Sequence, residues 1–546
     1  MYNYLKLKVP MNNSDNNYIF LPEWFPTKFS DSEKKLTWLW ESGHNPVPTT
    51  PLSTGIRNLT TSEGANDANK YLNREQRSIS KVINGYTYYA NNLTSAENID
   101  EENIHNLKVN NLVNKLDEDW KTKYLPEIIN DLTEMKKNID IISDLKSGLN
   151  VLDYIMKLHK RHWYIHFLVV LPLHDSTDKF YKFLQNFIDD FKLSDLYNLF
   201  NGIDNKSIEI DKYLYELVHK YKDDLDSINT DDFFDLINNT EFKSDNSNKF
   251  LQEFLEFINF YGYRSVGFDL KDSIWIEDPQ IVLNILKRYP MSINKSKSIE
   301  YSAELRQQTL NMILSKLPSD KEIGEFHELY DLLKEIWYLK EDHSFYIDQS
   351  SSSVLSLAIK KIGKLMHEEA LIDKAEDIFF LKMNELNLYR EEAGSIGFKN
   401  QILLRKEEMN KFKNITPPKY LGTIDANQSE SMSMNTMEKI KIFKGVPASL
   451  GKAIGPAKII KSFEDSEKLK EGDIMVCIST NPSWTPLFGI VSAIISETGG
   501  TLSHTAVVAR EYNIPTILEV ENSTELISDN DLIEVDADQG IITIIS

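Results

Sequence analysis

The sequence predicts a multidomain protein in which a large, mostly α-helical region is followed by a C-terminal α/β domain. Between residues 91 and 414, apolar residues recur at spacings of three and four, which is typical of amphipathic helices. After residue 439 the pattern changes to short apolar runs of strand length, separated by turns that contain glycine. A chain of 546 residues is long enough for roughly two to four domains with cores of their own.

The first 90 residues differ in composition from the helices that follow. They are rich in aromatic side chains, including Trp24, Trp38 and Trp40. Residues 46–51 read Pro-Val-Pro-Thr-Thr-Pro, a run that no helix can contain. We therefore expect an aromatic, proline-rich segment over residues 1–90 at the start of the larger region 1–414.

Ten helices are predicted from apolar periodicity, and turn signals such as Leu317-Pro318-Ser319-Asp320 separate several of them. Their expected ranges are 111–124, 126–146, 151–171, 179–199, 208–223, 249–261, 301–317, 321–338, 353–369 and 375–391.

A flexible linker is predicted over residues 415–438. This stretch contains Pro417-Pro418 and continues with Ser, Asn, Gln and Met residues that show no periodicity. About 24 such residues span roughly 25–30 Å as a coil, which suits a domain that swings between two positions.

The C-terminal domain, residues 439–546, places His504 between a strand and a helix. The apolar run 491–496 comes first, and Gly499-Gly500-Thr501-Leu502-Ser503 leads into the histidine. The helix that follows must end before Pro515. Backbone N–H groups at the start of a helix are unpaired, and the helix dipole there favours an anion. This position suits an imidazole that accepts and holds a phosphoryl group.

The domain closely resembles the phosphohistidine swivelling domain of the PEP-utilising enzymes, a family that includes phosphoenolpyruvate synthase, pyruvate phosphate dikinase, rifampicin phosphotransferase and phenylphosphate synthase. The matching segments are 445–457, 471–476, 480–485, 499–515, 533–537 and 540–542. The resemblance implies that His504 carries the phosphoryl group. It also implies phosphoryl contacts from residues around it, namely Gly499, Gly500, Thr501, Ser503 and Arg510.

Each of these residues has a plainer alternative. A lone histidine at this place would favour a helix-capping or buried role in an ordinary α/β domain, but the Gly-Gly turn before His504 and the matching segments around it argue against that alternative. Ser503 would serve equally as a plain N-cap. Arg510 lies about 240° around the helix from His504, so packing or a salt bridge is an equal alternative to phosphate contact.

The helical region carries a second resemblance, to the acceptor-binding domain of the rifampicin phosphotransferase and phenylphosphate synthase group. The landmarks are Trp38 with 43–48, 84–86, 261–264 with 275–279, 340–343 and 376–381. The resemblance implies that residues 1–414 hold a small organic acceptor with a hydroxyl group. The layout is that of the phenylphosphate synthase histidine subunit, or of a rifampicin phosphotransferase without its ATP-grasp domain.

Attack of a hydroxyl on phosphohistidine needs a base and cations near the transferred group. His343 is the candidate base, beside Glu341 and Asp342, and Arg264 and Arg306 are the candidate cations. The alternatives are a solvated helix end for the two carboxylates, a structural role for the histidine, and pairing of Arg264 with a nearby aspartate.

No metal is expected on this chain. His162 and His166 stand at a spacing of i, i+4, which can ligate a metal. Trp163 occupies the position at which a zinc protease has glutamate, and core packing is the favoured explanation.

ATP and Mg²⁺ are expected mainly on a separate ATP-grasp protein, because no glycine-rich phosphate-covering loop precedes the swivelling domain. The family resemblance then implies that ATP and acceptor give AMP, phosphate and phosphorylated acceptor.

The net charge of −22 argues against nucleic-acid or anionic-membrane partners, which require basic patches. One cysteine, Cys477, excludes a disulfide framework within the chain. With no apolar run of membrane-spanning length and no signal peptide, we expect a cytoplasmic protein.

Three functional hypotheses follow. The chain delivers phosphate from His504 to an acceptor hydroxyl, or it uses the same phosphohistidine to activate a substrate for dehydration or condensation. In the third, it is a non-catalytic relative that binds a ligand.

Overall fold

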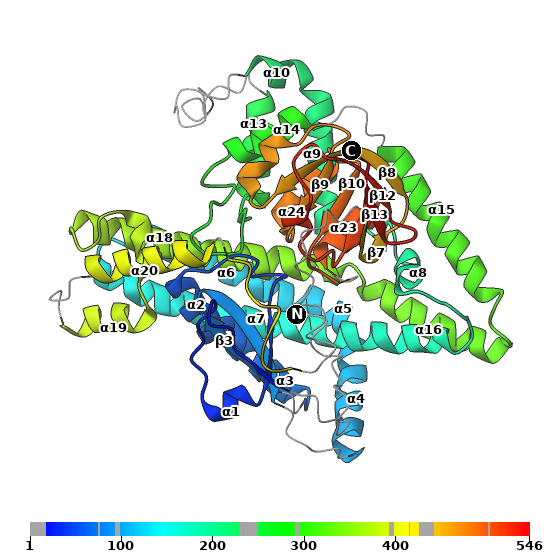
Figure 1. Ribbon diagram of the computed structural model, residues 1–546, viewed down its shortest axis with the longest axis horizontal. Coiled ribbons are helices and arrows are strands. Elements are labelled where there is room, and N and C mark those ends of the chain that lie inside the picture. The colour runs from blue at the N-terminus through cyan, green and yellow to red at the C-terminus, as the bar shows by residue number, and fades with distance from the viewer. Residues whose placement is uncertain are drawn as a thin grey trace.

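The computed structural model describes residues 18–74, 77–92, 99–228, 233, 249–289, 295–392, 398–413, 415–424, 442–500 and 503–545. Helices dominate up to residue 413, and an α/β domain occupies residues 442–545 (Figure 1), which confirms the predicted fold class.

A 41-residue helix, α7 (Leu145–Gln185), forms the centre of the helical region, and α3, α6, α16 and α18 pack along it. It begins at a capping box, in which Asp144 accepts from the Ser147 N–H at 2.8 Å. The prediction of separate helices over 151–171 and 179–199 was wrong here, since the helix continues through Pro172. Every residue from 165 to 174 is buried, and this all-round packing outweighs the helix-breaking tendency of proline.

Most of the other helices follow the predicted ranges, but 111–124 is divided among α4, α5 and η3, and 375–391 is divided between η5 and α19. Their bounds are α1 (Asp31–Lys34), α2 (Pro51–Arg57), η2 (Asn58–Ser62), α3 (Glu63–Tyr71), α4 (Ile99–Val113), α5 (Leu116–Asp119), η3 (Trp120–Tyr124), α6 (Leu125–Asp140), α8 (Leu193–Asn198), α9 (Lys206–Lys220), α10 (Lys222–Ser227), α13 (Lys249–Tyr261), α14 (Gln280–Arg288), α15 (Lys295–Leu314), α16 (Asp320–Ile336), α17 (Leu339–His343), the π-helix η4 (Ser344–Ser351), α18 (Ser352–Glu368), η5 (Ala375–Phe380), α19 (Met383–Glu392) and α20 (Lys399–Lys413).

An antiparallel five-stranded sheet accounts for the aromatic N-terminal segment. Its strand order is β1 (Tyr18–Phe20), β5 (Tyr420–Ile424), β2 (Thr37–Trp40), β4 (Tyr86–Asn92) and β3 (Arg77–Ile83). Trp38, Tyr86 and Tyr88 are buried on it. Strand β5 belongs to the segment expected to be linker, and it is ordered because Leu421 is buried and the strand pairs on both sides. Residues 425–438 of the expected linker lie outside the described residues.

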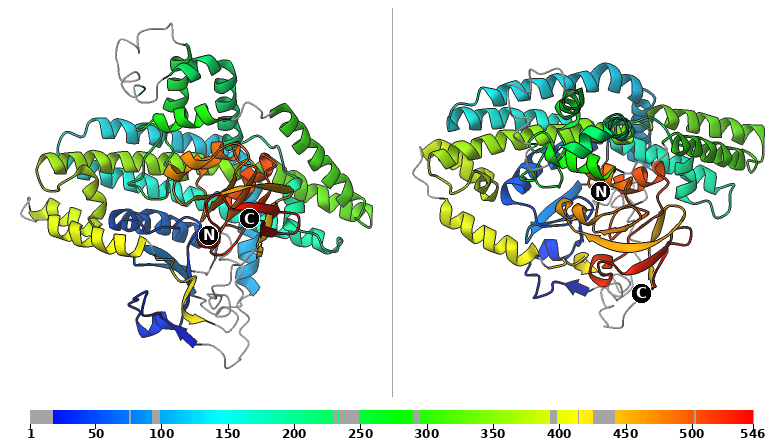
Figure 2. Two further views of the ribbon diagram at one scale, coloured as in Figure 1. Left: turned by 45° about the horizontal axis from the view of Figure 1, so that its top comes forward. Right: turned by 90° about the horizontal axis from the view of Figure 1, so that it is seen from above.

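The C-terminal domain is built on an eight-stranded sheet that lies against the helical region (Figure 2). Strands β8 (Lys452–Ile460), β9 (Ile474–Cys477), β10 (Ala493–Ser496) and β11 (Thr516–Leu518) are parallel neighbours. The sheet is completed by β12 (Leu532–Asp536), β13 (Ile541–Ile544) and β6 (Ile442–Lys444) beyond β8, and by β7 (Val446–Ser449) beyond β11. Its helices are η6 (Phe463–Lys468), η7 (Pro482–Trp484), α22 (Thr485–Phe488), α23 (His504–Glu511) and α24 (Ser523–Leu526).

The central strands divide their side chains between two cores. Ile474 and Val476 belong to the core of the domain itself, whereas Met475 and Cys477 belong to a cluster that continues into the helical region. Alternation along one strand therefore joins the two regions through a shared apolar layer.

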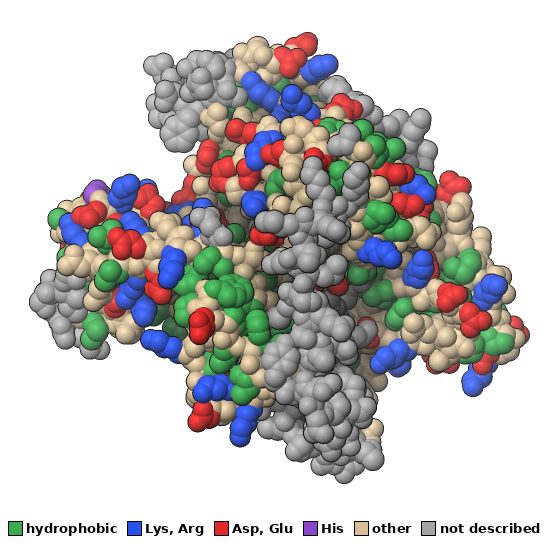
Figure 3. Space-filling view, in the orientation of Figure 1, with side chains coloured by type: hydrophobic (Ala, Val, Ile, Leu, Met, Phe, Trp, Pro, Cys, Tyr) green, Lys and Arg blue, Asp and Glu red, His purple; other side chains and the backbone are tan. Residues whose placement is uncertain are grey.

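Acidic and basic side chains are interspersed over the face shown in Figure 3. Within the described part of the chain, no helix combines the length and apolar character needed to cross a membrane.

Candidate active site at the interface of the two regions

His504 is the first residue of helix α23. The preceding Ser503 caps this helix, with its hydroxyl accepting from the Ala506 N–H at 3.4 Å. The turn before it is held by a hydrogen bond of 2.8 Å from Ser503 N to the carbonyl of Gly500. Gly499 has a φ of +100°, a conformation that L side chains rarely adopt. The Gly-Gly turn thus sets the entry of the chain into α23, and Thr501 lies outside the described residues.

Both ring nitrogens of His504 have a partner. Nδ1 lies 3.0 Å from Oε2 of Glu341, and Nε2 lies 2.9 Å from Oγ1 of Thr485. An ionised carboxylate only accepts hydrogen bonds, so Nδ1 carries the proton in this contact. In the neutral ring the lone pair is then on Nε2, which makes Nε2 the nucleophilic atom.

Glu341 reaches this position from α17, in the helical region. Its carboxylate is buried and also accepts a hydrogen bond of 2.7 Å from the hydroxyl of Ser207, on α9. Burial acts to raise the pKa of Glu341, but the charge and hydrogen bond of His504, together with the Ser207 bond, lower it below its ordinary value. The carboxyl group is therefore ionised where it meets the imidazole.

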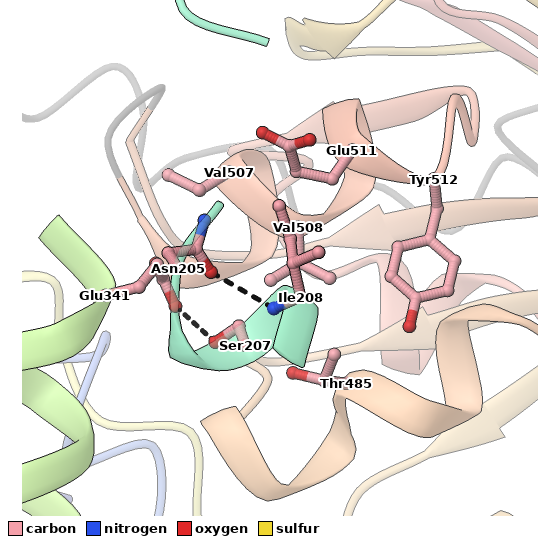
Figure 4. A pocket seen from close by; sticks show the side chains of 9 residues that line it. All are labelled: Asn205, Ser207, Ile208, Glu341, Thr485, Val507, Val508, Glu511 and Tyr512. Atoms are coloured by element: carbon pink, nitrogen blue, oxygen red, sulfur yellow. Dashed lines mark hydrogen bonds between the residues drawn. The ribbon is translucent and has the colours of Figure 1, made fainter. Parts of the chain in front are cut away.

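A small pocket lies beside this contact (Figure 4). Side chains from α9 and α17 form one wall and side chains from α22 and α23 form the other. The lining residues are Asn205, Ser207, Ile208, Glu341, Thr485, Val507, Val508, Glu511 and Tyr512. It has room for about one water molecule.

Glu511 closes the far end of α23. Its carboxylate accepts a hydrogen bond of 3.0 Å from the N–H of Gly202, in the helical region. Burial raises the pKa of Glu511 to about 8. This group is consequently sensitive to pH in the range where the protein is expected to work.

Further hydrogen bonds fix the C-terminal domain against the helical region. The loop 479–484 provides four of them: Ser479 Oγ to the Gly43 carbonyl at 2.8 Å, Asn481 Nδ2 to the Gly267 carbonyl at 3.0 Å, Trp484 Nε1 to the Val266 carbonyl at 3.0 Å, and Arg264 Nη2 to the Pro482 carbonyl at 2.6 Å. The structure therefore shows the domain docked, with His504 directed at the helical region.

Both arginines proposed as cations, Arg264 and Arg306, have structural partners. Arg264 is buried, and it holds Pro482 rather than pairing with an aspartate. Burial lowers its pKa to about 10, so it remains charged. Arg306 donates to the carbonyl of Asn201 at 2.7 Å, and within the described part of the chain it forms no hydrogen bond or ion pair with His504.

Arg510 and Asp342 have contacts with groups other than the imidazole. Arg510 is buried with its guanidinium 4.4 Å from the ring centre of Tyr197, which agrees with the packing alternative. Asp342 accepts from the backbone N–H of Lys206 at 2.8 Å, and burial raises its pKa to about 6. Glu341 is thus the predicted acceptor-region residue that reaches His504 directly.

His343 faces a second histidine instead of His504. Its ring centre lies 4.7 Å from that of His166, and its Nδ1 donates to the carbonyl of Leu339. Burial lowers the pKa of His343 to about 4, with the charge of His166 acting in the same direction. His343 is therefore neutral at pH 7.

Thr485 and Ser207 are contributors that the sequence did not single out. Thr485 lies at the end of the segment 480–485 that resembles the family, which was the available signal. Ser207 is an ordinary residue near the start of a helix, and only the tertiary structure connects it with Glu341.

Two family models match the chain. Residues 469–540 match the mobile domain of PEP-utilising enzymes, and residues 177–341 match the fourth domain of rifampicin phosphotransferase. His504 lies in the first match, and Glu341 is the last residue of the second. The contact between them joins these two matched segments.

Three known proteins are similar to this chain in sequence. An uncharacterized phosphotransferase, YvkC of Bacillus subtilis, is 31% identical over 395 residues, which cover 70% of this chain and 47% of that protein. Chondramide synthase cmdD of Chondromyces crocatus is 26% identical over 558 residues, covering 96% of this chain and 14% of the synthase. Rifampicin phosphotransferase of Bacillus subtilis is 29% identical over 309 residues, covering 55% of this chain and 35% of that enzyme.

This chain therefore spans less than half the length of each of these relatives. The resemblance predicted from the sequence is confirmed at the level of its parts. The chain carries a mobile domain of the PEP-utilising enzymes, preceded by a region similar to the fourth domain of rifampicin phosphotransferase.

Proposed function

We propose that this chain is the histidine-bearing component of a phosphotransferase. It carries a phosphoryl group on Nε2 of His504 and delivers it to a hydroxyl group of a small organic acceptor. The observation that supports this most directly is the contact of 3.0 Å between His504 Nδ1 and Glu341 Oε2, because it joins the mobile domain to the region that resembles the rifampicin phosphotransferase domain.

Glu341 assists transfer by holding a proton on Nδ1. With Nδ1 protonated, the ring that leaves phosphorus is neutral imidazole, which is a far better leaving group than its anion. The phosphorus–Nε2 bond breaks as the bond from phosphorus to the acceptor oxygen forms. The released Nε2 is then a base that can take up the proton lost by the acceptor hydroxyl.

Charging takes place in a different position of the mobile domain. The pocket beside this contact has room for about one water molecule, so in the docked state neither a nucleotide nor an acceptor fits there until the two regions move apart. We propose that the domain leaves this position and receives phosphate from ATP on a separate ATP-grasp protein. That partner would hold Mg²⁺ to neutralise the charge on the phosphates.

The test uses ATP labelled at the β-phosphate, the full chain, and fractions of a cell extract from its source. We expect AMP, phosphate and a labelled small molecule in those fractions that contain both the ATP-grasp protein and the acceptor, and none when the chain is omitted. A dehydrated or condensed product without label would instead support the activation hypothesis. Labelling of the chain by ATP alone would contradict the separate partner.

A further inference from the structure

We infer that His166, His343 and Asp348 form a binding site for one divalent transition-metal ion. One potential ligand atom from each residue lies within 4.8 Å of the others. The residues come from α7, α17 and the π-helix η4, so the site joins three elements. Short π-helical segments are frequent at functional sites, and η4 extends over eight residues.

The hydrogen bonds already prepare His343 to ligate a metal. Its Nδ1 donates to the carbonyl of Leu339, which leaves the lone pair on Nε2. Histidines that bind metals usually donate their other ring N–H to a carbonyl or carboxylate in this way, because the bond fixes the tautomer and the ring orientation.

His166 and Asp348 supply the other two ligands. Nδ1 of His166 lies 2.7 Å from Oδ1 of Asp348, and the side chain of Asp348 is 30% exposed while that of His166 is 8% exposed. The site is thus enclosed by the protein on the histidine side and open to solvent at the carboxylate. An ion has a path of entry there, and water can complete its coordination.

The neighbouring histidines of α7 do not share these properties. Both ring nitrogens of His162 are engaged, Nδ1 with Ser351 at 2.7 Å and Nε2 with Asp131 at 3.2 Å. Nε2 of His159 accepts from the indole N–H of Trp163 at 3.1 Å. The i, i+4 pair of His162 and His166, noted in the sequence, is therefore not the metal pair. His166 instead combines with His343 and Asp348, which follow it in the chain by 177 and 182 positions.

Two imidazoles and one carboxylate suit Zn²⁺ and similar first-row ions, whereas Mg²⁺ prefers oxygen ligands. Ligand distances of about 2.0–2.2 Å place tetrahedral ligand atoms roughly 3.4 Å apart. Atoms that already lie within 4.8 Å of one another reach this spacing through small side-chain rotations.

The consequence for function rests on the proposed phosphotransfer. Residue 343 is two positions after Glu341 on α17, about 200° around the helix, so the metal and His504 lie on different sides of α17. The ion would therefore not touch the reacting atoms. By tying α17 to α7 and η4, it would position Glu341 against His504.

Binding is tested on the purified full chain after removal of metals with a chelator. We expect one Co²⁺ or Zn²⁺ per chain by titration calorimetry, and for Co²⁺ a visible absorption band typical of mixed nitrogen and oxygen ligands. Asp348→Asn and His343→Gln should each weaken binding at least tenfold. His327→Gln removes an exposed histidine on α16 and should leave binding unchanged.

If a variant does not fold, the wild-type chain still decides the question through its melting temperature, which should rise with equimolar Zn²⁺ and not with Mg²⁺. Absence of stoichiometric binding, or equal weakening by His327→Gln, would overturn the site. These measurements use no ATP, so they do not depend on the proposed function.

The positioning role has its own readout. Removing the metal should slow transfer from phosphorylated His504 to the acceptor and leave the charging of His504 unchanged. If metal binds but both steps proceed equally with and without it, the site stands and its role in positioning Glu341 is overturned.

Discussion

Nδ1 of His504 and Oε2 of Glu341 lie 3.0 Å apart across the interface between the mobile domain and the helical region, although 163 positions separate the two residues in the chain. Ser207 donates to the same carboxylate oxygen. Under the proposed function, this buried carboxylate meets the imidazole only when the domain is docked, so it serves transfer to the acceptor and not the charging of His504.

Glu341→Gln should slow transfer to the acceptor about 100-fold and leave charging of His504 unchanged. The amide keeps the shape of the side chain but removes the negative charge that stabilises a proton on Nδ1. Rapid-quench measurements of phosphohistidine formation and decay separate the two steps. Glu335→Gln, which removes an exposed carboxylate on α16, is the matched control, and equal slowing of both steps by Glu341→Gln would contradict this role.

Thr485→Val should slow both half-reactions about tenfold, because Thr485 belongs to the mobile domain and travels with His504. Valine keeps the volume of the side chain and removes the hydroxyl that contacts Nε2. The same rapid-quench experiment provides the measurement. Thr498→Val also removes a hydroxyl of this domain, one that donates to the carbonyl of Ile478 at 2.8 Å, and it should leave both rates near those of the wild type.

Gly499→Ala should lower the free energy of unfolding by about 1–2 kcal/mol. The residue has a φ of +100°, and an added Cβ would lie 3.0 Å from Oγ of Ser503, the cap of α23. Gly324→Ala is the matched control, because nothing lies within 4 Å of its added Cβ. This control is expected to be neutral or to stabilise its helix by up to about 1 kcal/mol. Denaturant titration of both variants tests the difference, and equal stabilities would contradict the strained turn.

Docking of the mobile domain should weaken as pH rises from about 5 to about 8. Burial raises the pKa of Glu511 to about 8 in the docked state, and the negative charge of Glu341 adds to this rise. The hydrogen bond from the Gly202 N–H and the charges of Arg510 and Arg306 oppose it. The raised value means that the docked form holds more protons than the released form across this window. Docking is therefore fully favoured by this group below the ordinary carboxyl pKa and loses that contribution as pH passes 8.

Energy transfer between dyes on Glu407→Cys and Gln539→Cys measures this docking, since both positions are exposed and the native Cys477 is buried. The additional change Glu511→Gln should flatten the pH dependence between about 5 and 8. An unchanged slope in that variant would assign the effect to other groups at the interface.

The sequence predicted the features that depend on residues close to one another along the chain. Helix α13 has the predicted bounds because its apolar spacing is regular, and His504 was located by the glycine turn in front of it. Helix α7 was divided incorrectly at Pro172, because its continuity depends on burial by other helices. Strand β5 was missed for a similar reason, since its partners come from residues about 400 positions earlier.

The site shows the same division. Glu341 was proposed from the chemistry that an acceptor region needs, but its contact with His504 arises from docking of two distant segments. The partnership of His343 with His166 and Asp348 likewise joins three elements, and no local spacing indicates it.

The central claim is that His504 carries the phosphoryl group, and labelling of the chain with β-labelled ATP tests it most directly. Wild-type chain and His504→Ala are each incubated with the ATP-grasp partner fraction, and bound label is followed in acid and in base. The account predicts label on the wild-type chain that is lost in acid and stable in base, and none on His504→Ala. Equal label on both proteins, or none on the wild-type chain with an active partner, would contradict it.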